Sequence, residues 1–213
     1  LSFPVDKMHA CAEEIFSNEA SFAFQYGITE GYPRLREQVS ARLRERFNTG
    51  TDDDDLIITT GGQQGIDLCA KVLCNEGDTV ICENPSFIGA LNAFRSYNTN
   101  LVGIDLEEDG MNIEALENAL KANPNTKIIY VIPTFQNPAG ITTSLEKRKA
   151  ILALAEKYNV LILEDNPYGE LRFSGEDVPT IKSLDTSGRV LYCSSFSKIL
   201  SAGMRIGFVC GPK

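Results

Sequence analysis

Short apolar segments alternate with amphipathic ones along most of the chain, and this alternation strongly restricts the possible folds. The apolar segments are rich in β-branched residues and apolar on both faces, which is typical of strands covered by helices on both sides. Segments of this kind predict strands at 56–60, 79–83, 100–105, 127–132, 160–165, 189–194 and 205–211. Amphipathic segments predict helices at 35–47, 63–75, 86–97, 112–123 and 144–159.

Repeated strand–helix–strand units predict an α/β fold with three layers, in which a mostly parallel sheet of about seven strands lies between helices. In such sheets, ligands bind beyond the carboxyl ends of the strands. We expect an N-terminal helical segment, residues 1–48, that leads into a large domain at 49–213. The sequence starts without Met and stops directly after the last expected strand, so we expect it to be part of a larger protein.

Composition and charge exclude several classes of function. The net charge of −9 argues against nucleic acid or an anionic membrane as the main partner, so local donors must hold any anionic ligand. The six cysteines include no CxxC pair and mostly lie in apolar runs, and the lone His9 cannot build a metal cluster. We therefore expect reduced thiols, a cytoplasmic protein and no metal site. No signal peptide and no long apolar run is present.

The segment "SSFSKILSAGMRIGF" near the end of the chain groups residues that suit covalent and anion chemistry. Near other cations or in a dry pocket, the amine of Lys198 can lose its proton and attack an aldehyde. Ser195, Ser197 and Arg205 could then surround a phosphate beside it. A single lysine is far more often a solvated surface charge, so this interpretation depends on the rest of the pattern.

Two further segments place suitable residues directly after expected strands. In "GGQQG", the backbone N–H groups of Gly62 and Gln63 could bind an anion at the start of a helix, although a plain glycine-rich turn would look the same. Phe87 in "NPSFIGA" could stack on a flat ring or pack as an ordinary core phenylalanine.

Polar side chains follow two more strands. The amide of Asn137, before Pro138, could hydrogen-bond a ligand oxygen or belong to a simple Asn-Pro turn. Asp165 ends a very apolar strand, and a buried carboxylate is costly unless it is paired. A protonated ring nitrogen or a backbone cap would be a suitable partner, and Tyr168 could add a phenolic hydroxyl.

Together these segments resemble those of a known enzyme family. The pieces "QYGITEGYPRLRE", "TTGGQQG", "NPSFIGAL", "YVIPTFQNPAG", "ILEDNPYGELRF" and "SSFSKILSAGMRIGF" span nearly the whole chain. In order and spacing they resemble the fold-type-I, pyridoxal-phosphate-dependent aminotransferases of class I/II. Within that class the resemblance is to the group with 2-aminoadipate and kynurenine aminotransferases and the aminotransferase-like half of MocR-type regulators.

The resemblance implies pyridoxal 5′-phosphate as cofactor and a role for each candidate residue. Lys198 would bind the cofactor covalently and later move the proton at the substrate Cα, while Asp165 would pair with the pyridine nitrogen. Asn137 and Tyr168 would hydrogen-bond the phenolate oxygen, and Phe87 would stack on the ring.

The phosphate contacts implied by the resemblance come from Gly62, Gln63, Ser195, Ser197 and Arg205. Tyr26 in "QYG" matches a family tyrosine that reaches the phosphate of the neighbouring subunit, which implies a homodimer with a shared active site. Gly62 stands where relatives often carry serine, so one hydroxyl donor is missing while its N–H remains.

The implied reaction moves an amino group between an amino acid and a 2-oxo acid. Two alternatives stay open: a regulator's sensor domain that binds pyridoxal phosphate without turnover, and a lyase or decarboxylase on the same scaffold. The family's small C-terminal domain, with the arginine that binds the substrate carboxylate, has no counterpart in the sequence. We therefore expect the chain to be the cofactor-binding large domain, inactive by itself.

Overall fold

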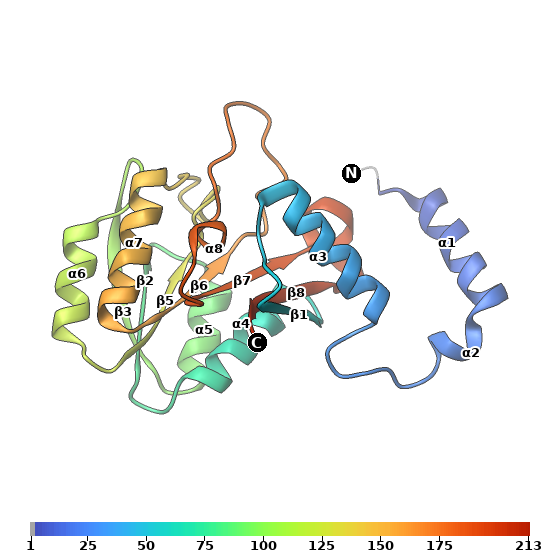
Figure 1. Ribbon diagram of the computed structural model, residues 1–213, viewed down its shortest axis with the longest axis horizontal. Coiled ribbons are helices and arrows are strands. Elements are labelled where there is room, and N and C mark those ends of the chain that lie inside the picture. The colour runs from blue at the N-terminus through green and yellow to red at the C-terminus, as the bar shows by residue number, and fades with distance from the viewer. Residues whose placement is uncertain (1–2) are drawn as a thin grey trace.

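The computed structural model describes residues 3–213 and contains one eight-stranded sheet between layers of helices (Figure 1). The strand order is β1-β8-β7-β6-β5-β2-β3-β4. The five neighbours from β7 to β3 run parallel, whereas β8 is antiparallel to both β1 and β7. The strands are β1 Asp54–Thr59, β2 Thr79–Asn84, β3 Asn100–Glu107, β4 Gly110–Met111, β5 Thr126–Val131, β6 Leu161–Asp165, β7 Val190–Ser195 and β8 Gly207–Pro212.

The three-layer, mostly parallel architecture predicted from the sequence is confirmed. Each predicted strand is present within a few residues of its expected bounds. The additional strand, β4, has only two residues and pairs with the end of β3. A two-residue strand is too short to show an apolar pattern, which explains why the sequence did not predict it.

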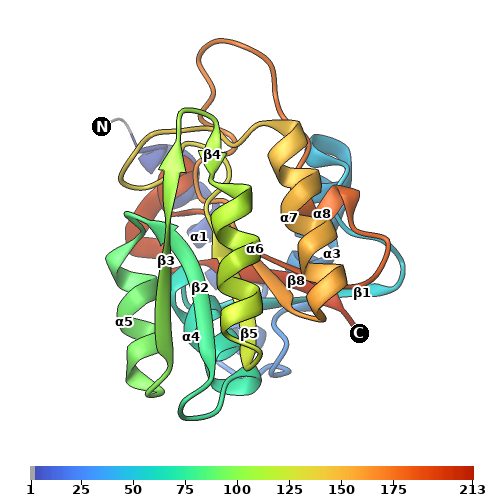
Figure 2. The same ribbon diagram turned by 90° about the vertical axis from the view of Figure 1, so that its left-hand side faces the viewer.

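Helices cover both faces of the sheet (Figure 2). α4 and α5 pack on one face, while α6, α7, α8 and α3 pack on the other. The helices are α1 Val5–Asn18, α2 Ala20–Ala23, α3 Pro33–Phe47, α4 Gly62–Leu73, α5 Ile88–Ser96, α6 Ile113–Ala122, α7 Leu145–Tyr158 and α8 Ile181–Leu184. A π-helix, η1 Ser197–Ser201, and a 3-10 turn, η2 Ala202–Met204, connect β7 to β8.

Local capping explains where several of these helices begin and end. The side chains of Asn112 and Ser144 accept hydrogen bonds from backbone N–H groups three residues later, which starts α6 and α7. Asn48 and Asn159 adopt the left-handed conformation that ends α3 and α7. These caps set the lengths of the connections that carry the chain back to the sheet.

The core consists of two apolar layers, one on each side of the sheet. In the layer beneath α4 and α5, Phe94 packs edge-on against Tyr130 with ring centroids 5.5 Å apart. Both side chains are completely buried. Each fully buried large apolar side chain stabilises the fold by about 1.5–3 kcal/mol, so these layers hold the strand ends in fixed positions.

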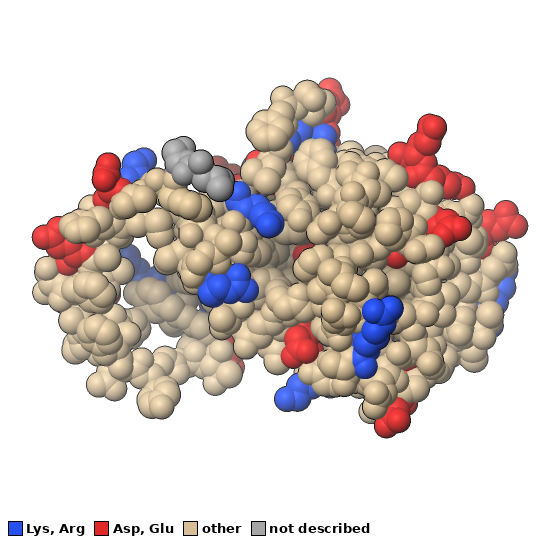
Figure 3. All heavy atoms as spheres, turned by 180° about the vertical axis from the view of Figure 1, so that it is seen from behind, with Lys and Arg blue, Asp and Glu red and all other residues tan. Residues whose placement is uncertain are grey.

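The N-terminal segment with α1 and α2 projects from the body of the molecule (Figures 1 and 3). Neither helix has a buried residue, and several large apolar side chains on this segment are exposed: Val5, Ile15, Phe16, Phe22, Phe24 and Ile28. Among residues 3–213, no helix combines the length and the apolar character needed to cross a membrane.

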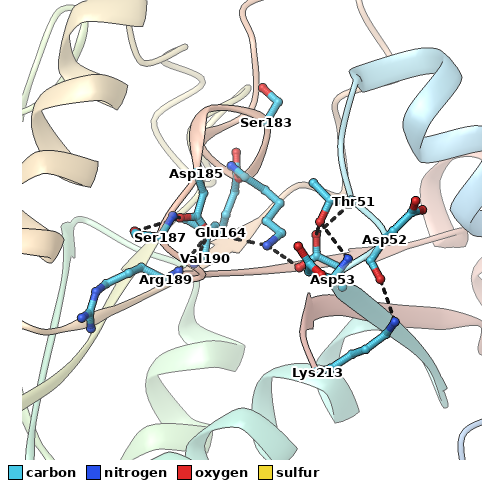
Figure 4. Close-up of polar contacts among 12 residues, drawn as sticks. Thr51, Asp52, Asp53, Glu164, Ser183, Asp185, Ser187, Arg189, Val190 and Lys213 are labelled. Carbon is cyan, nitrogen blue, oxygen red and sulfur yellow. Dashed lines mark hydrogen bonds and ion pairs between the residues drawn. The ribbon is translucent and has the colours of Figure 1, made fainter.

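A buried ionic cluster joins the amino ends of β1 and β7 (Figure 4). The amine of Lys182 lies 2.6 Å from Asp54 and 3.5 Å from Asp185. Asp185 also accepts a hydrogen bond from the backbone N–H of Val190, the first residue of β7. The cluster ties α8 to the end of the sheet opposite to the carboxyl ends of the parallel strands.

Candidate functional site

An open cavity of about 270 Å³ lies at the carboxyl ends of the parallel strands. The cavity is lined by most of the residues that the sequence singles out for cofactor binding: Gly62, Gln63, Phe87, Asn137, Asp165, Tyr168, Ser195, Ser197, Lys198 and Arg205. Residues from five separate segments of the chain therefore converge on one cavity. Tyr26 does not line it and is fully exposed on the N-terminal segment.

One end of the cavity has the character of an anion site. α4 begins at Gly62, and the first N–H groups of a helix have no acceptor within the helix. Arg205 reaches the same end, where its guanidinium donates to the carbonyls of Ala202 at 3.1 Å and Thr60 at 3.4 Å. Gly61 has a φ of +80°, and a Cβ atom there would collide with the guanidinium of Arg205. Glycine therefore favours the left-handed turn and leaves room for the guanidinium, which a side chain at this position would displace.

Two serine hydroxyls complete this end of the cavity. The hydroxyl of Ser195 donates to that of Ser197 at 2.7 Å, and the N–H of Ser197 donates to the Ser195 oxygen at 3.0 Å. Gly207 packs so closely on the peptide between Gly61 and Gly62 that a Cβ there would collide with it. Gly62, Ser195, Ser197 and Arg205 all line this cavity, and donors of these kinds suit a phosphate group.

Lys198 lies in the π-helix η1, directly after Ser197, and its exposed side chain lines the open cavity. π-helical turns are rare and are frequently found at functional sites. The short irregular segment from β7 to β8 therefore brings Ser197, Lys198 and Arg205 to the same cavity. A regular helix of the same length would place these side chains in other relative positions. The sequence indicated the grouping of these residues but not the π-helical geometry.

Asp165 is the last residue of β6 and is 5% exposed. Burial raises the pKa of its carboxyl to about 6, although a hydrogen bond from Tyr130 opposes this shift. The phenol of Tyr130 donates to Oδ2 at 2.8 Å. Within residues 3–213, Oδ1 receives no hydrogen bond, and Asp165 lines the cavity. This carboxylate therefore has one oxygen fixed by the fold and one that suits a cationic ligand atom.

Tyr130 is a site residue that the sequence did not single out. It lies within the apolar strand β5, where an aromatic side chain suggests only core packing. The available signal was that a buried tyrosine hydroxyl needs a hydrogen-bond partner. The register pairs Tyr130 with Leu163 on the neighbouring strand, two residues before Asp165, and this pairing supplies the partner.

Asn137 and Tyr168 meet on another side of the cavity. The side-chain amide of Asn137 donates to the phenolic oxygen of Tyr168 at 3.4 Å. Burial and the nearby charge of Asp165 raise the pKa of Tyr168, whereas the hydrogen bond from Asn137 lowers it. The two groups together offer an amide N–H and a phenol O–H to one ligand oxygen.

Phe87 precedes α5 and is half-buried at the edge of the cavity. The side chain of Gln63 donates to the carbonyl of Gly89 at 2.9 Å, which ties the start of α4 to the start of α5. The flat face of a phenylalanine at this position suits an aromatic ligand ring.

Comparison with known proteins places the chain in a family. The family described as aminotransferase class I and II matches residues 4–213. The chain belongs to this family. It is 44% identical over 212 residues to the aromatic-amino-acid aminotransferase 1 of Thermococcus litoralis. That match covers 98% of this chain and 51% of the relative.

Solved structures of family members share the fold. A kynurenine aminotransferase from Pyrococcus horikoshii, in complex with PMP, is 42% identical with a TM-score of 0.94, covering 98% of this chain and 52% of that one. An α-aminoadipate aminotransferase from Thermus thermophilus, complexed with N-(5′-phosphopyridoxyl)-L-leucine, is 35% identical with a TM-score of 0.89, covering 98% and 53%. The chain thus spans about half the length of the relatives it matches.

Proposed function

We propose that the protein is a pyridoxal-phosphate-dependent aminotransferase that moves an amino group between an amino acid and a 2-oxo acid. The observation that carries this proposal is the convergence of three features on one cavity. These are the amine of Lys198, a buried carboxylate with one oxygen left for a ligand, and a cluster of anion donors around Arg205.

The residues present fit pyridoxal phosphate. Bound in the cavity, the cofactor supplies an aldehyde carbon and a ring that withdraws electrons from the substrate Cα. Asp165 would hold a proton on the ring nitrogen, because an opposite charge within hydrogen-bond distance favours the charged form. Arg205, Ser195 and Ser197 would bind the phosphate. Phe87 would cover one face of the ring and orient it.

Lys198 and the pair formed by Asn137 and Tyr168 would serve the chemistry directly. The amine of Lys198, once deprotonated, would accept the proton that leaves the substrate Cα and could then donate it to another atom. Asn137 and Tyr168 would donate hydrogen bonds to the phenolate oxygen of the cofactor and so fix its orientation.

We further propose a homodimer in which Tyr26 contacts the phosphate bound to the partner subunit. Tyr26 is fully exposed and does not line the cavity of its own chain, which supports this arrangement. Exposed apolar side chains on α1 and α2 are consistent with a partner surface. The six free cysteines support a reducing, cytoplasmic location.

The test of the function measures pyridoxal-phosphate binding and amino transfer by the intact protein, with Lys198→Ala beside Lys71→Ala as a matched control. Wild type and Lys71→Ala should bind the cofactor with a visible absorption band and convert an amino acid to its 2-oxo acid. Lys198→Ala should do neither. Binding without turnover by wild type would contradict the aminotransferase and favour a sensor, and elimination products would favour a lyase.

A further inference from the structure

Two loops that follow neighbouring strands each carry one of the proposed cofactor contacts. The loop after β2 leads to Phe87, and the loop after β5 carries Asn137. Between the two loops lies a pair of polar side chains outside the cavity lining, Glu83 and Gln136. Each of them is only 2% exposed, and neither has a role in the mechanism described above.

The amide of Gln136 connects the two loops directly. Its Nε2 donates to Oε2 of Glu83 at 2.9 Å and to the carbonyl of Pro85 at 2.8 Å. Its Oε1 accepts from the N–H of Ala139 at 2.8 Å. Both ends of this amide are therefore satisfied, and they fix the residue that immediately precedes Asn137.

Glu83 holds the second loop at an additional point. Its Oε2 also accepts a hydrogen bond from the backbone N–H of Ile132, the residue directly after β5. A single carboxylate oxygen thus binds the start of this loop and, through Gln136, its middle. Because a loop fixed at two points has little freedom between them, the side chain of Asn137 is held in a defined place.

Keeping the carboxylate of Glu83 buried and ionised costs free energy of folding. Burial raises the pKa of Glu83 to about 7, and the charge of Asp165 acts in the same direction, against the hydrogen bonds from Gln136 and Ile132. An apolar side chain of similar size would avoid the cost of burying a charge. The carbonyl oxygen of a protonated or amidated side chain could still accept both hydrogen bonds.

We propose that Glu83 is a positioning residue that acts through Gln136 to fix Asn137 relative to Phe87. Glu83 would thereby fix the position of the Asn137 amide, which binds the phenolate oxygen, relative to the Phe87 ring, which stacks on the same cofactor. This inference rests on the proposed function, because it assigns Glu83 a role toward pyridoxal phosphate.

The test measures the dissociation constant and the visible absorption band of bound pyridoxal phosphate in matched variants. Glu83→Leu and Gln136→Leu should each weaken binding about tenfold and shift the band. Glu83→Gln keeps an acceptor oxygen and should stay within about threefold of wild type. Asp54→Leu removes a buried carboxylate from the opposite end of the sheet, so it should lower stability without shifting the band.

A double-mutant cycle with Asn137→Ala separates positioning from a loss of stability. If Glu83 acts through Asn137, then Glu83→Leu should weaken binding in wild type and have little further effect in Asn137→Ala. An equal effect in both backgrounds, or an effect of Asp54→Leu as large as that of Glu83→Leu, would overturn the inference. Absence of pyridoxal-phosphate binding by wild type would instead contradict the proposed function itself.

Discussion

At the scale of single residues, the fold divides the two oxygens of Asp165 between two tasks. Oδ2 accepts from the phenol of Tyr130, and Oδ1 is left without a donor in the described chain. Since the pKa of Asp165 in the folded protein lies above its ordinary value of 3.8, ionisation of this group opposes folding. Its contribution to stability is present below about pH 4 and is lost as the pH rises through about 6.

Tyr130→Phe tests whether this hydrogen bond keeps Asp165 ionised. Hydrogen bonds to charged groups contribute about 1.5–3 kcal/mol, so its loss should raise the pKa of Asp165 above about 6 in the cofactor-free protein. Carbon NMR of labelled aspartate would follow the titration. Pyridoxal phosphate should bind roughly tenfold more weakly near that pH and approach wild-type affinity as the solution becomes alkaline.

Tyr158→Phe is the matched control, because Tyr158 donates to Glu117 at 2.9 Å at a site remote from the cavity. It should leave the titration of Asp165 unchanged. An unaltered pKa of Asp165 in Tyr130→Phe would show that burial alone sets its protonation.

The sequence predicted the cavity-lining residues better than the residues that support them. Lys198, Asp165 and Arg205 belong to compact motifs in which the neighbours along the chain indicate the chemistry. Tyr130 and Glu83 act on partners 35 and 53 positions away. Such pairs arise only from strand register and loop packing, which no short segment of sequence encodes.

At the scale of elements, the turn from β1 into α4 depends on a glycine for two separate reasons. Gly61 adopts a φ of +80°, which a side chain disfavours, and it leaves room for the guanidinium of Arg205. Gly77 has a similar φ of +84° but no atom near the position of a Cβ. The two glycines allow backbone strain and side-chain collision to be measured separately.

Gly61→Ala and Gly77→Ala should both lower the free energy of unfolding, by about 1–2 kcal/mol from backbone strain. Only Gly61→Ala should also weaken the binding of pyridoxal phosphate and of inorganic phosphate, because it displaces Arg205. Chemical denaturation and phosphate-competition titrations would measure the two effects. Equal phosphate affinities in both variants would remove Arg205 and the α4 turn from the anion site.

Apolar runs predicted the strands because burial on both faces imposes a strong and local pattern. The direction of β8 could not be predicted this way, since an antiparallel strand between β1 and β7 carries the same apolar residues as a parallel one. Its direction follows from the short connection through η1 and η2, which returns the chain at once to the same end of the sheet.

At the scale of the whole molecule, the N-terminal segment presents Tyr26 to solvent while the cavity of its own chain lies elsewhere. In the proposed homodimer, each cavity combines Lys198 of one subunit with Tyr26 of the other. In such a dimer, two different defective subunits can form one intact site. A site contained within one subunit could not be restored in this way.

Lys198→Ala and Tyr26→Phe should each bind pyridoxal phosphate poorly as homodimers. When the two variants are mixed and allowed to exchange subunits, the mixed dimer contains one cavity with both native residues. High-affinity binding should therefore reappear in the mixture, as measured by equilibrium titration. A mixture that behaves as the sum of the separate variants would contradict a site shared between subunits.

The central claim is that Lys198 is the residue that binds the cofactor covalently. The most direct measurement is to add pyridoxal phosphate to the protein, reduce with borohydride and map the labelled peptide by mass spectrometry. The account predicts the label on Lys198 and its loss in Lys198→Ala, which lacks the amine that reacts with the aldehyde. A label on Lys71, Lys182 or any other lysine would contradict it.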